Sequence, residues 1–230
     1  MITQLLMRKK KPVIFWDQKN NEPVCTQFGY SRGTPIDRYY IDKFLDENIH
    51  LIKGSGLEVG DNYYFNKYYT KKVQSVDVLH PVNGNEMATI IGDLTKKETL
   101  PASCIDCFIC TQVFNFIYDV QKAVEGAYHV LKPGGTLLAT VNGIAQISRF
   151  DMDRWGDYWR FTTASMQKLI SDVFADGEID IVTYGNVLAA TSLLYGLCVE
   201  DLPDRSLLDH RDDNYQVIIA IKAKKVKIKC

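Results

Sequence analysis

Acidic residues stand at the ends of three successive apolar segments in the middle of the sequence. Glu58 lies in LEVGD, Asp77 in SVDVL and Asp93 in IIGDL. Asp77 follows Glu58 by roughly twenty residues, the spacing at which an acid after one strand can reach the hydroxyl pair of a ribose. Any one of these carboxylates alone is typical of a surface loop. Their joint placement indicates a site for a nucleoside, because carboxylates accept hydrogen bonds from hydroxyls and amines.

The elements that would position these acids are short apolar runs separated by helical or polar stretches. Seven runs have the length and composition of buried strands: LEV, SVDVL, ATII, CFIC, TLLATV, IDIVTY and YQVIIAI. They are too apolar for a sheet with one solvent-exposed face, so we expect helices on both faces. Strands that alternate with helices predict an α/β fold, Rossmann-like and doubly wound, with a mainly parallel seven-stranded sheet. In such a fold ligands bind outside the carboxyl ends of the strands.

Three helices can be predicted from their first residues and their apolar spacing. In RGTPIDRYYIDKFL, Thr34 suits the N-cap and Pro35 the first helical position. Asp119 suits the cap of the helix in DVQKAVEGAYHVL, and a threonine suits the cap of the helix in TTASMQKLISDVF. The first of these helices would cover the core as an N-terminal helical cap.

The stretch CIDCFIC places Cys104, Cys107 and Cys110 at intervals of three. Such a spacing also occurs in iron–sulfur and zinc sites. Cys107 and Cys110 belong to an expected buried strand, however, where residues three apart point to opposite faces. A metal site needs thiolates that converge, whereas a free cysteine behaves as a small buried hydrophobe. We therefore expect core residues here and no metal.

The composition is ordinary for a soluble globular protein, with 46% hydrophobic and 24% charged residues. A formal net charge of −1 leaves no basic excess for nucleic acid. The stretch from Ile181 to Val199 carries no charge, yet Gly185-Asn186 within it is typical of a turn. We expect a strand followed by a buried helix there, and no membrane span.

Domain organisation and compartment follow from the same features. We expect a single domain over residues 1–230, with an N-terminal extension and capping helix in residues 1–50 and the Rossmann-like core in residues 51–230. MITQLLMRKKK places its basic run after a short apolar stretch, the reverse of a secretory leader. Six cysteines in a chain of this size make a poor disulfide framework. These features predict a cytoplasmic protein.

The order of the motifs GLEVGD, SVDVL, ATIIGDL and IDCFICTQVFNFIYDVQKAVEGAYHVLKPGGTLLATV resembles the class I S-adenosylmethionine-dependent methyltransferases. The resemblance covers roughly residues 56–141, and its most specific part is the fourth strand, its helix and LKPGGTLLATV. The flanking stretches RGTPIDRYYIDKFL and DMDRWGDYWRFTTASMQKL resemble a subset of that family associated with bacterial surface polysaccharide and capsule biosynthesis.

The resemblance implies a site for S-adenosylmethionine at the strand ends. The cofactor-binding residues that it implies are Glu58, Gly60, Asp77, Val78, Asp93, Leu94 and Thr111. The first two would lie beside the methionine part of the cofactor. Asp77 would hold the ribose and Asp93 the adenine amine, with Leu94 beside the ring. Thr111 would lie at the approach to the sulfonium, and His80 is a candidate for the border of the adenine pocket.

Two segments rich in arginine and aromatic residues are the candidates for an acceptor site. They contribute Arg32, Arg38, Arg154 and Arg160. Arginine forks suit phosphate or carboxylate groups, and neighbouring aromatic rings suit the face of a sugar or base. The alternative interpretation is a packed aromatic loop whose arginine stems cover apolar surface. A hydroxyl acceptor must lose a proton, and Asp157 is the predicted base, with Tyr158 beside it as the second catalytic candidate.

We therefore predict an S-adenosylmethionine-dependent methyltransferase that methylates an oxygen of a small polar acceptor. A sugar, a sugar nucleotide or a phosphorylated precursor of a cell-surface polysaccharide would suit the site. The alternative is a non-catalytic Rossmann-like partner module of a glycosyltransferase system. The first loop favours this alternative, because Gly60 is followed by DNYY rather than by further glycines, whereas Glu58, Asp77 and Asp93 favour the enzyme. A nicotinamide dehydrogenase is disfavoured because no G-x-G-x-x-G follows the first strand. No nucleic acid partner is expected, and a homodimer stays open.

Overall fold

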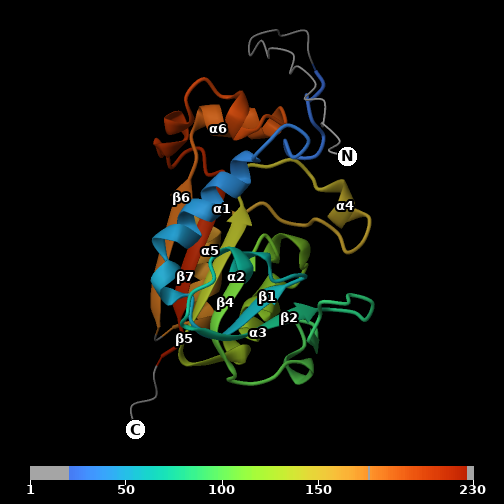
Figure 1. The fold of residues 1–230 in the computed structure, drawn as a ribbon, viewed down its shortest axis with the longest axis vertical. Helices are drawn as coiled ribbons and strands as arrows, with labels where there is room; N and C mark the ends of the chain where they lie inside the picture. Colours follow the sequence, from blue (N-terminus) through green and yellow to red (C-terminus); the bar gives the residue numbers. More distant parts are fainter. Residues whose placement is uncertain (1–20, 176, 227–230) are drawn as a thin grey trace, which may run out of the picture.

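The computed structural model describes residues 21–175 and 177–226. One sheet runs through this part of the chain, with the strand order β3-β2-β1-β4-β5-β7-β6 (Figure 1). Its strands are β1 (Gly54–Val59), β2 (Val73–His80), β3 (Ile90–Ile91), β4 (Ile105–Thr111), β5 (Leu131–Asn142), β6 (Glu178–Tyr184) and β7 (Ile218–Lys224). The pairings from β3 across to β5 are parallel, and β7 is antiparallel to both β5 and β6. The predicted Rossmann-like, mainly parallel, seven-stranded sheet is therefore confirmed.

Parts of two predictions fall outside the described residues. They are residues 1–20 of the expected N-terminal extension and, within them, the basic run of MITQLLMRKKK.

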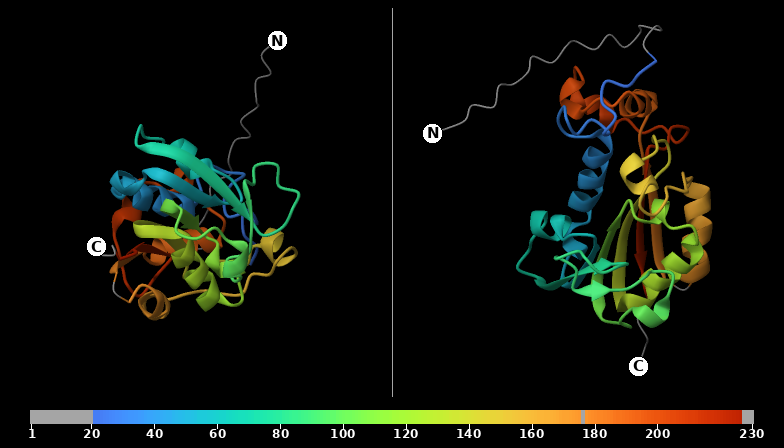
Figure 2. Two further views of the ribbon diagram at one scale, coloured as in Figure 1. Left: turned by 90° about the horizontal axis from the view of Figure 1, so that it is seen from below. Right: turned by 90° about the vertical axis from the view of Figure 1, so that its right-hand side faces the viewer.

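Helices cover both faces of the sheet. They are α1 (Ile36–Glu47), α2 (Tyr63–Lys67), α3 (Val120–Val130), α4 (Arg149–Met152), α5 (Thr163–Val173) and α6 (Val187–Leu194). Short 3-10 helices lie between or after them: η1 (Ile49–Leu51), η2 (Lys97–Thr99), η3 (Phe114–Phe116), η4 (Val199–Asp201) and η5 (Arg205–Asp209). One apolar cluster joins α1, α2 and α6 to one face, and a second joins α3 and α5 to the other. The right-hand view of Figure 2 shows α1 on one side of the sheet and α5 on the other.

Two of the three predicted helix starts match the structure. The Asp119 carboxylate accepts a hydrogen bond from the amide of Lys122 and caps α3. Thr162 caps α5 in a reciprocal pair with Ser165. The predicted cap of α1 is wrong, because the N-cap is Pro35, whose ring offers no hydrogen-bond acceptor to the helix amides.

Thr34 instead joins the start of α1 to a late part of the chain. Its amide and its hydroxyl both donate to the carboxylate of Glu200, at 2.8 and 2.7 Å. The Tyr40 hydroxyl, one turn into α1, donates to the carbonyl of Leu208 at 3.0 Å. The N-terminal helix is therefore part of the core rather than a loose attachment.

The cysteines of CIDCFIC lie as the strand pattern predicts. Cys107 and Cys110 are both buried in β4. Cys107 packs in the cluster with α1, whereas Cys110 packs in the cluster with α3, so the two thiols face opposite sides of the sheet. Burial raises the pKa of the Cys107 thiol to about 12, which keeps it protonated at neutral pH. Among the described residues, no three His, Cys, Asp or Glu side chains gather as a metal site.

The uncharged stretch from Ile181 to Val199 folds into the end of β6, a turn and α6. No helix in residues 21–175 and 177–226 is long and apolar enough to cross a membrane.

The carboxyl ends of the central strands meet at one edge of the sheet. Val59 pairs with Leu79, and the amide of Gly60 donates to the carbonyl of Leu79 at 3.0 Å. β2 therefore reaches this edge at His80, whereas Asp77 pairs with Leu57 further back along the strand. This register decides which polar side chains can meet a ligand.

Candidate cofactor and acceptor site

A cleft of about 1370 Å³ lies over this edge of the sheet. This volume exceeds the several hundred Å³ of a typical small-molecule site, so the cleft has room for two ligands. Four kinds of segment line it: the ends of β1, β2 and β4 with the loops that follow them, the loop after β3, the 142–158 segment, and the N-terminal part of the described chain. The residues used below that line it are Phe28, Tyr30, Asp37, Arg38, Gly60, His80, Asn85, Gly92, Asp93, Leu94, Thr95, Thr111, Gln112, Tyr118, Ser148, Arg149, Phe150, Asp151, Trp155, Asp157 and Tyr158.

Gly60 follows β1 directly and opens onto the cleft. Its backbone has a φ of +86°, and a Cβ placed on it would meet no atom within 4 Å. The side-chain amide of Asn85 donates a hydrogen bond of 2.6 Å to the Gly60 carbonyl, and this bond fixes the loop. Because a single glycine here leaves open space against the backbone, a ligand can approach the loop without the further glycines that the sequence lacks.

Glu58 lies beneath this loop rather than in the cleft. Its side chain is buried, and its carboxylate accepts hydrogen bonds of 3.1 Å from the amides of Tyr64 and Phe65 at the start of α2. Burial raises the pKa of the Glu58 carboxyl to about 7, although the two amides oppose the change. The structure thus places Glu58 as an anchor for the segment that follows Gly60.

The end of β2 places a different side chain in the cleft from the one the sequence suggested. Asp77 lies outside the lining, and its carboxylate accepts a hydrogen bond from the Thr89 hydroxyl at 2.8 Å. Val78, the next residue, is buried. His80 lines the cleft and ends the strand. The sequence had indicated His80 only as a candidate for the border of the adenine pocket, although the apolar run continues beyond Asp77 as VLH.

The loop after β3 brings Asp93 and Leu94 to the cleft, as expected. The Asp93 carboxylate accepts hydrogen bonds from the amide and the hydroxyl of Thr95, at 2.9 and 2.8 Å. Burial alone would raise the pKa of this carboxyl, but these bonds and Lys96 lower it below its ordinary value. Asp93 is therefore an ionised acceptor at neutral pH. At Gly92 a Cβ would come within 2.6 Å of the Thr99 carbonyl, so this tight turn requires glycine.

The end of β4 contributes Thr111 and then Gln112. Gln112 is buried and has a φ of 57°, a left-handed conformation that costs a non-glycine residue about 1 kcal/mol. Phe28, which also lines the cleft, has a φ of 55°. Strained backbone of this kind tends to gather at ligand sites. No feature of the amino-acid sequence indicates these two conformations.

Only one of the four predicted arginines lines the cleft. Arg32 forms a two-point ion pair with Asp201, at 2.7 and 2.9 Å. The guanidinium of Arg154 lies over the Phe150 ring, 3.5 Å from its centre, and outside the lining. Arg38 does line the cleft, and 32% of its side chain is exposed.

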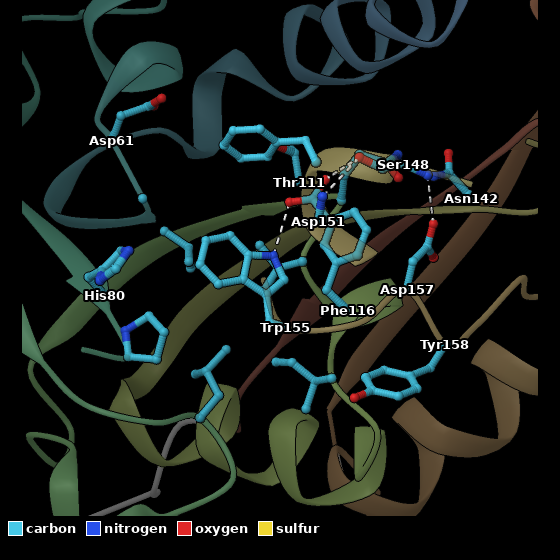
Figure 3. Close-up of a pocket in the computed structure, with 18 of the residues that line it drawn as sticks. Asp61, His80, Thr111, Phe116, Asn142, Ser148, Asp151, Trp155, Asp157 and Tyr158 are labelled. Carbon is cyan, nitrogen blue, oxygen red and sulfur yellow. Dashed lines mark hydrogen bonds between the residues drawn. The ribbon is translucent and has the colours of Figure 1, made fainter. Parts of the chain in front are cut away.

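Arg160 is the fourth arginine, and it pairs with the predicted base. It donates to both oxygens of Asp157, at 2.6 and 2.9 Å, and to nearby carbonyls. Asp157 also accepts from the amide of Ser148, and its side chain is almost fully buried (Figure 3). Both carboxylate oxygens are thus bonded within the protein, which fixes the 148–160 segment over the strand ends. Tyr158 lines the cleft and is 48% exposed.

Aromatic side chains surround the mouth of the cleft. Figure 3 shows Trp155 reaching into its middle, with its ring nitrogen donating to Asp151 at 3.0 Å. The Trp155 ring meets His80 edge to face, at 6.4 Å between centres. Tyr118 meets Tyr158 in the same manner at 5.4 Å. The Trp155–His80 contact joins the 148–158 segment to the end of β2.

Comparisons with known proteins agree with this fold. Residues 62–139 match the model of a methyltransferase domain. No curated protein matches the sequence. Among solved structures, the chain resembles the [4+2]-cyclase SpnF, with a TM-score of 0.55 and 15% identity over 90% of this chain and 89% of that one.

Two further solved structures are S-adenosylmethionine-dependent methyltransferases. The one from Mesorhizobium loti has a TM-score of 0.53 and 12% identity, over 83% of this chain and 98% of that one. The one from Archaeoglobus fulgidus has a TM-score of 0.52 and 10% identity, over 82% of this chain and 94% of that one. Identities this low show a shared fold. The match to the methyltransferase-domain model covers residues 62–139, about a third of the chain.

Proposed function

We propose that the protein transfers a methyl group from S-adenosylmethionine to a small polar acceptor bound in the same cleft. The observation that carries the proposal is that Gly60, Asp93, Leu94 and Thr111, from three different strand ends, line one cleft large enough for a donor and an acceptor.

The residues present suit the donor. Gly60 offers open space beside its backbone, the ionised Asp93 offers an acceptor for an amine, and Leu94 offers an apolar surface for a ring. We propose that His80 takes the position beside the ribose, with Asp77 and Val78 supporting the strand behind it. Glu58 would act through the loop that it anchors.

The chemistry asks the protein for positioning more than for acid–base work. S-adenosylmethionine supplies a methyl group that is already activated for displacement. The cleft must exclude water and align the acceptor oxygen with that methyl group. A hydroxyl acceptor also loses a proton, for which Tyr158 lies in the cleft, while Asp157 and Arg160 hold the segment that carries it.

We propose a sugar-like acceptor, and a methylated oxygen, from the aromatic rim formed by residues such as Trp155, Tyr118 and Tyr158. A sugar nucleotide or phosphorylated precursor of a surface polysaccharide would have this character. Arg32 and Arg160 are each paired with an aspartate, so Arg38 is the one of the four predicted arginines that the cleft offers to an anionic group. Arg149 also lines the cleft, with its guanidinium 3.6 Å from the Asp153 carboxylate.

A single domain and a cytoplasmic location belong to the same proposal. The contacts of Thr34 and Tyr40 with residues 200 and 208 support one folding unit across residues 1–50 and 51–230. No disulfide joins two cysteines within the described part of the chain, as suits a reducing compartment.

Calorimetric titration with S-adenosylmethionine and S-adenosylhomocysteine tests the proposal. We expect both to bind the wild type, and Gly60→Ala to weaken both. Gly84→Ala is the matched control, because Gly84 also has a positive φ, +109°, and open space around its Cβ, yet lies outside the cleft lining. If neither ligand binds at millimolar concentration, the proposed donor is wrong. Equal losses in both variants would show backbone strain rather than loss of a ligand contact.

SpnF provides the second candidate function. A [4+2]-cyclase with this fold shows that the fold itself does not require methyl transfer. A non-catalytic partner module is the corresponding alternative for this chain. It predicts no transfer of label from radioactive S-adenosylmethionine to any sugar or sugar phosphate, even where the ligand binds.

A further inference from the structure

We propose that Arg38, with the hydroxyls of Tyr30 and Tyr64, forms an anion subsite at the α1 side of the cleft, shaped for one carboxylate or phosphate group. The inference rests on the proposed function to the extent that the anion belongs to a small molecule bound in this cleft.

The hydrogen bonds around Arg38 leave donors unused. Its Nε donates to the Tyr30 hydroxyl at 2.7 Å, and its Nη1 donates to the Tyr64 hydroxyl at 3.0 Å. Since each hydroxyl oxygen accepts from the arginine, each hydroxyl proton is left to donate elsewhere. Arg38 Nη2 donates no hydrogen bond to any described residue. Three donors thus gather in one place.

The tyrosines keep those protons at neutral pH. Burial raises the pKa of Tyr30 and of Tyr64 above the ordinary value, and this outweighs the opposing effect of Arg38. Tyr30 and Arg38 both line the cleft, whereas Tyr64 lies behind them at the start of α2. An anion in the cleft would therefore meet the arginine and Tyr30 first, with Tyr64 holding the arginine from behind.

The pairing of Arg38 differs from that of the other buried arginines. Arg32 and Arg160 each place two nitrogens on both oxygens of one aspartate. Arg38 has only Asp37 nearby, with 3.8 Å between Nε and the closest oxygen, which is beyond hydrogen-bond distance. Asp37 instead accepts from the backbone amide of Arg38, at 2.8 Å.

The charge of Arg38 is therefore incompletely compensated by the protein. Burial also raises the pKa of Asp37, so its negative charge is disfavoured at this position. Arginine forks bind carboxylate and phosphate through two parallel hydrogen bonds. The Arg38 side chain is only partly exposed and has an unused fork edge, so an anion could bind at Nη2 and accept the Tyr30 proton as well.

Two sources could supply the anion: the carboxylate in the amino acid part of the donor, or an anionic group of the acceptor. Three probes separate them. S-adenosylhomocysteine carries the carboxylate, and 5′-methylthioadenosine keeps the nucleoside but lacks the amino acid part. Inorganic phosphate, titrated at constant ionic strength, represents an anion of the acceptor.

The experiment compares wild type, Arg38→Gln and Arg154→Gln by calorimetry with each probe. Arg154→Gln is the control, because Arg154 lies outside the cleft lining. If the anion belongs to the donor, Arg38→Gln should lower the affinity for S-adenosylhomocysteine about 10- to 100-fold, the effect of losing a charged hydrogen bond. The affinity for 5′-methylthioadenosine should then stay unchanged. If it belongs to the acceptor, both nucleosides should bind unchanged and phosphate should bind wild type but not Arg38→Gln. Either pattern supports the subsite.

Two outcomes overturn it. One is that no probe distinguishes Arg38→Gln from wild type. The other is that Arg38→Gln weakens both nucleosides equally and leaves phosphate binding unchanged. Should Arg38→Gln fail to fold, Tyr30→Phe removes one donor from a half-exposed ring and should weaken the same probe by a smaller factor. A wrong donor proposal would give a different result, because the wild type would then bind neither nucleoside. The titration with phosphate would still test Arg38 in that case.

Discussion

The buried carboxyl of Glu58 should make the stability of the fold depend on pH, and Glu58→Gln should remove that dependence. The side chain is 4% exposed, and among the described residues its only hydrogen-bond partners are the amides of Tyr64 and Phe65. Its pKa rises from an ordinary 4.5 to about 7 on folding. Each tenfold change in proton affinity is worth about 1.4 kcal/mol, so the effect on stability is about 3 kcal/mol.

The direction follows from which state holds the proton more tightly. The folded protein binds the Glu58 proton more tightly than the unfolded chain does, because burial disfavours the charged form. The stabilisation from proton binding is therefore fully present below pH 4.5. It is lost as pH rises from 4.5 to about 7, where the folded carboxyl must ionise. The measured quantity is the free energy of unfolding of the wild type minus that of Glu58→Gln. Above that pH this difference should be about 3 kcal/mol lower than it is in acid.

Urea unfolding of wild type, Glu58→Gln and Glu86→Gln over this pH range measures the effect. Glutamine keeps an oxygen for the amides of α2 but cannot ionise. Glu86 is exposed, so its variant controls for the loss of one carboxyl. The difference between wild type and Glu58→Gln should change by about 3 kcal/mol across the range, and the control should follow wild type. If the curves of wild type and Glu58→Gln run parallel, Glu58 is not held in a site that favours its neutral form.

Further predictions concern the cleft and its supports. Arg160→Ala should lower the free energy of unfolding by about 3 kcal/mol, because it leaves the buried Asp157 without its cation, and a urea titration that shows no loss would contradict this pairing. His80→Ala should weaken S-adenosylhomocysteine in calorimetry roughly tenfold, and more than Asp77→Ala does, since only the histidine lines the cleft; the reverse order would restore Asp77 as the ribose ligand. S-adenosylhomocysteine should change the tryptophan fluorescence of the wild type, and Trp155→Phe should abolish that change; a signal that survives would place the ligand away from this ring. Elemental analysis of the purified protein should find no stoichiometric zinc or iron.

The central strands could be predicted because burial on both faces of a sheet requires a continuous apolar run in the sequence. A strand covered on both sides must be apolar at nearly every position, and the runs of the central strands β4, β5 and β7 show this most clearly. Opposite orientation of Cys107 and Cys110 follows from the same alternation and needs no tertiary information.

The partners of charged side chains could not be predicted in this way. Asp157 and Arg160 stand three residues apart, and their types suit a bound ligand as well as they suit each other. Only the path of the backbone decides that they pair. Arg38 meets Tyr64, 26 residues later, for a reason that appears only when α1 and α2 share one face of the sheet.

The ties between α1 and the end of the chain also determine when the cleft can exist during synthesis. Arg32 and Asp201 are 169 residues apart, and Tyr40 and Leu208 are 168 residues apart. Contacts this distant must await the emergence of the last part of the chain, and they make folding slow. Until then α1 lacks these partners, and the cleft lacks the wall to which Tyr30 and Arg38 belong. The parallel strands β1, β2 and β4 therefore leave the ribosome well before the chain can bind a ligand, and a protein shortened before residue 201 would lose β7 together with these ties.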